Sequence, residues 1–495
     1  MKNYEGGNTV WGCTYDTMQR AGKAKIGVFM MTLSIVIFYS LLFGLGLNKA
    51  MEFTLPQIKR RTLSWIRTKT LAEPTEPPLV EWLYTNLTTE MYILSAYYDD
   101  RPTVEFLAVR IIGVADKGRI EDKGERVFCV VWGGTNDLVG SVPEEMAATH
   151  IGPGAWSLGK YFREYIFVCP LTNVSISRPS FVSVIDETYF NKTKNQSREI
   201  SLKETLATLP KIPVRYPERP LNKLDFGQCT SITYWTLDPY RIVEWVELHR
   251  IWGVKEMNIY GSVINDTSDR VFRHYHSGGF LKYTRIRRPM NETSEPIFLL
   301  MASTVINDCI YKNMYRYNKI VVVDLDELIV PRGNLSTYNE LIETIDRSIK
   351  LEHPNRMYMF QNVYFFFELP QDVRFPEQVV TLRQIGRLRD LTPVGTAAKS
   401  IIDPMACTNM HNHFCWHVAK LSDKPSHTNY VNPDLGLNQH YKKCHFDRYM
   451  KSYNLPPCKE ALKNFTTDKN MQRFSHLLIP RVKTELDKLG LPHQL

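Results

Sequence analysis

An uncharged stretch of 22 residues, from Ile26 to Leu47, constrains this 495-residue chain more than any other feature. A helix of that length can cross the hydrocarbon core of a bilayer. The stretch starts too far from Met1 for an ordinary signal peptide, and no small-residue cleavage site follows it. We therefore expect a signal anchor rather than a cleaved leader. Lysines and arginines lie on both sides of the stretch, so the positive-inside rule does not decide its orientation.

Glycosylation sequons and cysteines decide the orientation instead. One cysteine, Cys13, precedes the stretch and eight follow it, an even set that permits four disulfides in an oxidising compartment. Sequons of the form Asn-x-Ser/Thr are glycosylated on the lumenal side of the membrane. All eight follow the stretch, at Asn86, Asn173, Asn191, Asn195, Asn265, Asn291, Asn334 and Asn464. We expect a single-pass type II protein with a lumenal C-terminal part.

The charge of the chain argues against a nucleic-acid partner. The formal net charge is +9, and the lysines and arginines are spread along the chain. A nucleic-acid binder gathers such residues on one element.

Composition and proline placement predict six segments. A Pro-containing stretch at 71–78 is typical of a linker, and a further group of prolines from Pro210 to Pro220 marks a second boundary. Between them, short β-type runs end in Gly and Asn turns. The expected segments are a cytosolic tail at 1–25, the anchor at 26–47, a stem at 48–97, a small mostly-β module at 98–220, a catalytic domain at 226–450 and a helical extension at 451–495.

Strands alternate with helices in the segment 226–450. The helix expected from Arg241 to Trp252 has apolar residues at helical spacing and a stop at Gly253. A longer helix is expected from Pro296 to Tyr317, followed by a β-branched strand at Lys319–Val323. Such alternation predicts an α/β fold with a parallel-rich sheet flanked by helices.

The strand at Lys319–Val323 leads directly into Asp324 and Asp326. Ligands of open α/β sheets bind at the carboxyl ends of the strands. Carboxylates at this spacing can hold Mg²⁺ or Mn²⁺, which would neutralise a diphosphate leaving group. The alternative is a surface turn whose acids pair with Arg or Lys, but such a turn does not require a buried strand before it.

Several segments, in this order, resemble glycosyltransferase family 92, formerly a domain of unknown function. The resemblance covers about Cys229 to Tyr449. The segments that carry it are Arg241–Val254, Asn258–Tyr260, Asn307–Tyr311, Asp324–Glu327, Lys399–Ile402 and His440–Tyr441.

This resemblance implies a GT-A-type, Rossmann-like fold, a divalent metal (usually Mn²⁺) and a UDP-sugar donor. UDP-galactose is the characterised donor of the family, and β-1,4 transfer to a glycan of a glycoprotein or glycolipid is its best-known activity. We expect a Golgi membrane location, with the endoplasmic reticulum as the alternative that the sequence leaves open.

The resemblance also suggests roles for particular side chains. Asp324 is expected to contact the ribose or the metal, and Asp326 to ligate the metal. A histidine near the C-terminal end of the domain often completes the metal site, with His440 as the first candidate and His411 as the second; the alternative is an ordinary polar or core histidine. Lys399 is expected either to bind the diphosphate or to be an ordinary solvated lysine.

Other roles stay open. Glu244 is a candidate for orienting the donor-site loop or is a helix-surface carboxylate. Inverting transfer needs a carboxylate base, for which Glu368 and Asp403 are candidates. The aromatic run Tyr364–Phe367 before Glu368 forms a sugar-stacking platform or part of the core.

Competing functions have weaker support. The histidines around Cys415 raise the possibility of zinc, although a lumenal disulfide suits this cysteine better. No P-loop, dinucleotide turn or Gly-x-Ser-x-Gly elbow is present in the sequence. The remaining rivals are a different UDP-sugar donor, a membrane-anchored glycan-binding protein without turnover, and a glycosidase, which would need a second flanking carboxylate.

Overall fold

The computed structural model describes residues 76–85, 87–133, 138–151, 159–172, 178–196, 202–235, 237–290, 297–348, 357–419, 428–444 and 456–495. The chain divides into two compact units, 1–74 and 75–495, and all described residues belong to the second. The predicted tail, anchor and most of the stem lie outside the described residues. Among the described residues, no helix is both long and apolar enough to span a bilayer.

A mixed eight-stranded sheet forms the centre of the segment that was expected to be catalytic. Its order is β1 (Leu79–Val80), β12 (Leu281–Ile286), β11 (Val254–Ile264), β10 (Leu224–Trp235), β13 (Tyr317–Val322), β18 (Lys399–Ile402), β15 (Met357–Phe360) and β21 (Thr428–Tyr430). The first five strands are parallel, and β18 is antiparallel to both β13 and β15. The predicted parallel-rich sheet is confirmed.

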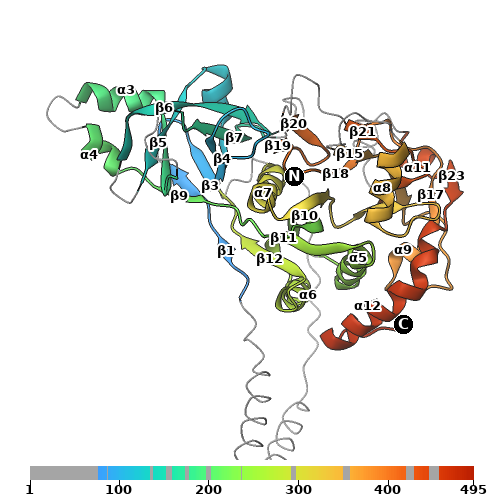
Figure 1. Ribbon diagram of the computed structural model, residues 1–495. Coiled ribbons are helices and arrows are strands. Elements are labelled where there is room, and N and C mark those ends of the chain that lie inside the picture. Colours follow the sequence, from blue (N-terminus) through green and yellow to red (C-terminus); the bar gives the residue numbers. More distant parts are fainter. Residues whose placement is uncertain are drawn as a thin grey trace, which may run out of the picture. The chain divides into compact units, whose positions relative to one another are not determined.

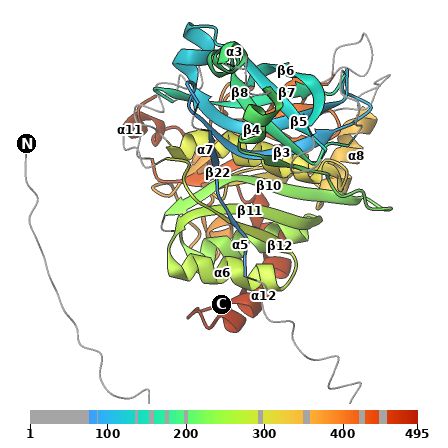
Figure 2. The ribbon, with the colours of Figure 1, turned by 90° about the vertical axis from the view of Figure 1, so that its left-hand side faces the viewer.

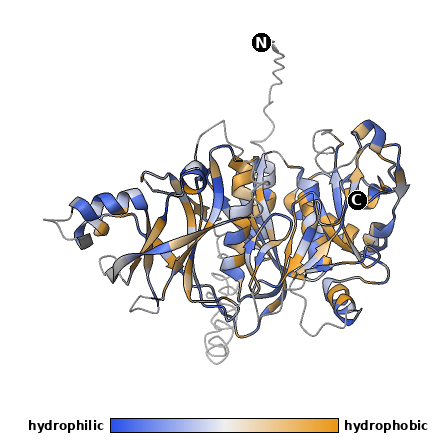
Figure 3. Ribbon diagram, turned by 90° about the horizontal axis from the view of Figure 1, so that it is seen from above, coloured by the Kyte–Doolittle hydropathy of each residue, from blue (hydrophilic) through white to orange (hydrophobic). Residues whose placement is uncertain are grey.

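Helices cover both faces of this sheet (Figure 1). One apolar core lies under α5 (Pro239–Ile251), α6 (Asp266–Ser277), α8 (Tyr338–Ser348) and α12 (Ser475–Leu489). A second core lies between the other face of the sheet and α7 (Ile297–Asn313). Figure 3 shows hydrophobic residues concentrated along the strands.

Local sequence explains where α5 begins and ends. The side chain of Asp238 accepts a hydrogen bond of 3.0 Å from the amide of Tyr240, and Pro239 occupies the first turn. Gly253, with a φ of 99°, follows the last turn, where a residue with a Cβ would be strained. The predicted helix stop is thereby confirmed.

A smaller three-stranded sheet lies beside the central one. Its order is β14 (Glu327–Pro331), β22 (Gly436–Lys442) and β16 (Asn362–Phe366). The register places His440 of β22 opposite Glu327 on one side and Tyr364 on the other. Tyr364, Phe365 and Phe366 are buried, so the aromatic run belongs to the core rather than to a sugar platform.

The N-terminal described part is a closed β-barrel. The strand order is β2 (Leu83–Thr85), β3 (Met91–Asp99), β4 (Ala108–Asp116), β7 (Phe162–Pro170), β6 (Leu138–His150), β5 (Val127–Trp132), β8 (Phe181–Asp186) and β9 (Ile212–Arg215). Pairing of β3 with β9 closes the sheet on itself. The predicted mostly-β module is present, and its first strands lie within the residues that were assigned to the stem.

Helix α7 belongs to the barrel as much as to the central sheet (Figure 2). Its side chains share one core with Leu94, Val114 and Phe162 of the barrel and with strands β10 and β13. Asp308 on α7 accepts a hydrogen bond of 2.8 Å from Tyr97 of β3 and one of 2.5 Å from Tyr260 of β11. One buried carboxylate therefore joins the two parts.

Short elements complete the described structure. They are α3 (Glu187–Gln196), α4 (Leu202–Ala207), α9 (Val380–Arg383), α11 (Cys458–Ala461), the pair β17 (Gly386–Leu388) and β23 (Phe465–Thr467), and the hairpin of β19 (Cys407–Met410) and β20 (Cys415–Val418). The eight cysteines after the predicted anchor form the four disulfides that the sequence permitted, Cys129–Cys169, Cys229–Cys309, Cys407–Cys415 and Cys444–Cys458.

Candidate active site

Acidic and basic side chains meet at one edge of the central sheet. Asp324 and Asp326 follow the carboxyl end of β13. Since β18 is antiparallel to β13, with Ser400 opposite Val322, the beginning of β18 lies at the same edge. Lys399, its first residue, therefore reaches Asp324.

Three side chains hold the carboxylate of Asp324. Its Oδ2 accepts a hydrogen bond of 2.7 Å from Nζ of Lys399 and lies 3.5 Å from Nδ2 of Asn412. Its Oδ1 accepts one from the hydroxyl of Ser231 on β10. Burial would raise the pKa of Asp324, but the ammonium of Lys399 outweighs burial and lowers it. The side chain is still 25% exposed, so a ligand can reach it.

Lys399 is completely buried, which rules out the solvated lysine considered above. Its ammonium lies 2.7 Å from Asp324 and 3.0 Å from Oε2 of Glu327. Burial by itself lowers the pKa of Lys399, but the two carboxylates overcome this effect and raise it. The lysine is thus a fixed cation at the base of the site. The predicted contact with a diphosphate stays a prediction.

Asp326 pairs with His440. Nε2 of His440 lies 2.9 Å from Oδ2 of Asp326, and Nδ1 lies 3.0 Å from Oε1 of Glu327. Burial opposes charge on both groups, yet their mutual attraction lowers the pKa of Asp326 and raises that of His440. Lys442 and Arg241 lower the pKa of Asp326 further. The carboxylate of Asp326 is 43% exposed.

The two aspartates fit a divalent cation whose remaining ligands come from the substrate and water. Among the described residues, no three Asp, Glu, His or Cys side chains are already arranged around one metal position. Mg²⁺ and similar ions are typically held by one or two carboxylates together with substrate phosphates and water. Within the described chain, Oδ1 of Asp326 accepts no hydrogen bond. His440 could ligate a metal only after losing a proton, because both of its ring nitrogens face carboxylates. Its role as a ligand stays a prediction.

The β19–β20 hairpin brings His411 close to Lys399. Burial, together with the charge of Lys399, lowers the pKa of His411 to about 4 and keeps the ring neutral. Cys415 is bonded to Cys407, which removes the thiolate that the zinc alternative would need. The role of His411 as a second-choice metal ligand stays a prediction.

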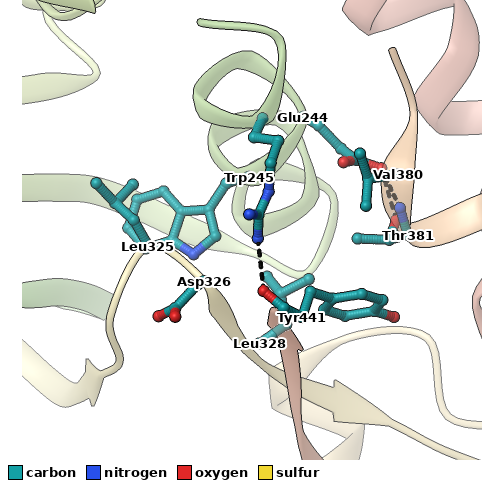
Figure 4. Close-up of a pocket in the computed structure, with 9 residues that line it drawn as sticks. Glu244, Trp245, Leu325, Asp326, Leu328, Val380, Thr381 and Tyr441 are labelled. Atoms are coloured by element: carbon teal, nitrogen blue, oxygen red, sulfur yellow. Dashed lines mark hydrogen bonds between the residues drawn. The ribbon is translucent and has the colours of Figure 1, made fainter. Parts of the chain in front are cut away.

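A small pocket adjoins Asp326 on the side of α5 (Figure 4). Glu244 lies in its wall and is buried, so it is not a helix-surface carboxylate. Its Oε1 accepts hydrogen bonds from the amide (2.9 Å) and the hydroxyl (2.7 Å) of Thr381 at the start of α9. The lining residues are Arg241, Glu244, Trp245, Leu325, Asp326, Leu328, Val380, Thr381 and Tyr441.

A family model decides what kind of protein carries this site. The model for glycosyltransferase family 92 matches residues 225–488, more than half of the chain. The chain belongs to glycosyltransferase family 92. The match begins with β10 and ends within α12, so it contains the whole central sheet except β1. The barrel precedes it.

Similarity to solved structures is weak. A mycobacterial protein has a TM-score of 0.21 at 11% identity, with coverage of 54% of this chain and 76% of the other. A mannosyltransferase from Pyrobaculum calidifontis, solved with GDP-Man and Mn²⁺, has a TM-score of 0.24 at 10% identity, with coverage of 62% and 83%. The bifunctional glycosyltransferase WbbM has a TM-score of 0.17 at 10% identity, with 39% of each chain covered. Scores this low carry no argument about this chain. No curated protein matches it.

The two candidate bases of this family 92 glycosyltransferase lie in different parts of the fold. Asp403 follows the far end of β18, four residues from Lys399 and therefore roughly 13 Å along the strand. Its Oδ1 accepts a hydrogen bond from the amide of Met405 in a turn. Glu368 is exposed beyond β16, and its carboxylate accepts from the amide of Cys444 at 3.2 Å. Asp403 therefore lies away from the edge with Asp324. The end of β16 before Glu368, in contrast, pairs with Lys442 of β22, next to Tyr441, whose amide donates to the carbonyl of Asp326. The role of either residue as the base stays a prediction.

Sequence reasoning missed three residues of the site. Ser231 could have been predicted once β10 and β13 were paired in parallel, because their register places Ser231 beside Asp324. Arg241 stands one turn before Glu244 on α5 and donates to the carbonyl of Tyr441 at 3.0 Å. No feature of the sequence indicated Asn412, because only the folded hairpin brings its side chain to Asp324.

Proposed function

We propose that this family 92 glycosyltransferase is a metal-dependent, inverting enzyme that transfers galactose from UDP-galactose to a glycan acceptor. One observation carries the metal-dependent part. Asp324 and Asp326 stand at the carboxyl edge of β13, partly exposed, with their carboxylates held by the buried Lys399 and the partly buried His440.

The residues of the chain would bind and orient the donor. The ion pairs with Lys399 and His440 keep both aspartates ionised and fix the direction of their carboxylates. Such fixed groups need little reorganisation when the substrate binds. Asp324 and Asp326 would hold Mn²⁺ or Mg²⁺. When bound, the cation supplies Lewis-acid stabilisation of the charge on the departing diphosphate.

The donor, the linkage and the location rest on the resemblance and on sequence features. UDP-galactose and a β-1,4 linkage are the properties expected of a family 92 member. The sequons and the disulfides support a type II protein of the secretory pathway, for which we propose the Golgi membrane. Of the sequons on described residues, Asn191, Asn195, Asn334 and Asn464 are exposed.

The test is UDP release by the purified full-length chain. UDP-galactose, UDP-glucose and the two UDP-N-acetylhexosamines would be compared with a panel of glycan acceptors, with Mn²⁺ or with a chelator. Asp326→Asn is the site variant, and Asp487→Asn, which changes an exposed acid of α12, is the matched control. We expect Mn²⁺-dependent UDP release from UDP-galactose, lost in Asp326→Asn and retained in Asp487→Asn.

Two other results would change the proposal. Turnover of a different UDP-sugar would replace the donor and leave the reaction class in place. If the folded chain binds glycans but turns over none of the donors, it is a glycan-binding protein, and the enzymatic proposal is wrong.

A further inference from the structure

The tip of the β19–β20 hairpin, residues His411–Phe414, lies against the candidate site. Nζ of Lys399 donates to the side-chain oxygen of Asn412 at 3.0 Å and to its backbone oxygen at 3.1 Å. The side-chain nitrogen of Asn412 lies 3.5 Å from Oδ2 of Asp324. Asn412 is half-buried, so part of its amide remains accessible to a ligand.

Strand β18 holds the tip in place. Nδ1 of His413 lies 2.9 Å from the carbonyl oxygen of Ala398, and Ser400 donates to the carbonyl of His413 at 2.7 Å. The residues on either side of Lys399 are therefore both bonded to His413, the residue that follows Asn412.

Helix α7 and the barrel hold the base of the hairpin. Asn307 of α7 donates to the carbonyl of Met410 at 2.8 Å and accepts from its amide at 2.9 Å. Arg101, a buried residue of the barrel, donates to the carbonyl of Cys407 at 2.7 Å. The disulfide Cys407–Cys415 closes the hairpin between these contacts. An element fixed at so many points places its tip with little freedom.

The chemistry at the tip suits a hydroxyl group. A hydroxyl donates one hydrogen bond and accepts others. The carboxylate of Asp324 can accept from it, and the amide N–H of Asn412 can donate to it. A site that satisfies a hydroxyl in both directions discriminates strongly against an analogue that lacks this hydroxyl, because buried polar groups then lose their partner.

We propose that Asn412 is a specificity-determining residue that, together with Asp324, contacts a hydroxyl of the sugar of the bound nucleotide sugar. The inference rests on the proposed function and assigns part of the donor site to the hairpin. Nothing in the sequence around Asn412 indicates this role, which arises from the hairpin that the barrel and α7 support.

Two variants test the contact. Asn412→Ala removes the whole amide but leaves Lys399 with Asp324, Glu327 and the backbone oxygen of residue 412, so folding should be preserved. Asn412→Asp keeps the oxygen that Lys399 uses, but it replaces the N–H donors with a carboxylate oxygen and adds a negative charge beside Asp324. Thr408→Val is the control, because its hydroxyl bonds within the hairpin to the carbonyl of His417, away from the tip.

The measurements are KM and kcat for the preferred nucleotide sugar, the ratio of kcat/KM between donor sugars, and the inhibition constant of UDP, which lacks the transferred sugar. We expect both Asn412 variants to lose at least tenfold in kcat/KM for the preferred donor and to discriminate less between sugars. The inhibition constant of UDP should change by less than twofold in Asn412→Ala, and Thr408→Val should behave like the unmodified chain.

Three results would overturn the inference. If the Asn412 variants stay within twofold in kcat/KM, Asn412 does not contact the sugar, whereas the proposed function stands. If the inhibition constant of UDP rises in step with KM, Asn412 acts on the nucleotide site as a whole. If the unmodified chain neither binds nor turns over any nucleotide sugar, the proposed function fails and the inference fails with it.

Discussion

Among single residues, Glu327 links the two cations of the candidate site. It is nearly inaccessible and lies 3.0 Å from both Lys399 and His440. Each cation also faces one of the two aspartates. The charges therefore form one connected group of three carboxylates and two cations, in which a change to one member affects the others.

Replacing Lys399 with Met should destabilise the fold strongly. The change leaves Glu327 and Asp324 close together without their shared cation, and breaking a buried pair in this way costs about 3–5 kcal/mol. Urea unfolding at pH 7 measures the loss. The double variant Lys399→Met/Glu327→Gln should be more stable than Lys399→Met alone. If the double variant is instead the less stable of the two, Glu327 is not the group that Lys399 neutralises.

Glu244 should make stability fall with increasing pH. Burial raises the pKa of Glu244 to about 7, although the bonds from Thr381 oppose the shift. Between the unfolded pKa near 4.5 and the folded pKa, the folded state binds more protons. Its stability is therefore lost as the pH rises through this interval, by about 3 kcal/mol in total.

Glu244→Gln removes this titration and retains an oxygen for Thr381. We expect the unfolding free energy of Glu244→Gln, relative to the unmodified chain, to increase by about 3 kcal/mol from pH 4.5 to pH 8. Urea denaturation at both pH values checks this difference. A relative stability that does not vary with pH would mean that Glu244 is ionised throughout.

The sequence identified site residues only where neighbours in the sequence define their position in the fold. Asp324 and Asp326 could be identified because they directly follow a buried strand, at whose carboxyl end ligands bind. Burial of Lys399 could not be predicted, since it depends on β18 being antiparallel to β13. Asn412 reaches Asp324 through a hairpin whose position depends on Arg101, about three hundred residues earlier.

Among the elements, α5, α7 and β13 were predicted with shifts of one to four residues in their ends. Helix α8 was not predicted. Helix α6 was not predicted either, because its many charged residues are typical of a polar connection. Its buried residues Ser268, Val271, Phe272 and Tyr275 nevertheless have helical spacing. Closure of the barrel was not predictable, because β3 and β9 pair across more than a hundred residues.

The stability of the packing around α7 should depend strongly on Asp308. In Asp308→Ala the hydroxyls of Tyr97 and Tyr260, both buried, lose their acceptor, and each unsatisfied hydroxyl costs about 1–3 kcal/mol. Thermal unfolding should show the loss as a lower Tm. Adding Tyr97→Phe and Tyr260→Phe to Asp308→Ala should recover part of it. No recovery would show that the hydroxyls find other partners.

At the level of the whole molecule, the part matched by the family model and the barrel belong to one compact unit. Tyr311, Met314 and Tyr315, at and just beyond the end of α7, are buried in a core that they share with Tyr97, Ile112 and Ile166 of the barrel. A chain that begins at residue 225 would expose this surface to water, and a large exposed apolar patch promotes aggregation.

We expect the fragment 225–495 to be aggregated and the fragment 76–495 to be monomeric and to unfold cooperatively. Size-exclusion chromatography and thermal unfolding of both fragments distinguish these states. A monomeric fragment 225–495 with a sharp unfolding transition would show that the barrel is dispensable for folding.

The shared helix also restricts how such a chain can evolve. A lineage cannot exchange the barrel for another domain without redesigning the outward side of α7 at the same time, because Asp308 and its neighbours serve both partners. Asp308 contacts Tyr97, Tyr260 and Arg215, the last at 3.3 Å, so variation at these residues must be matched on α7. We therefore expect the barrel and the central sheet to be inherited as one unit.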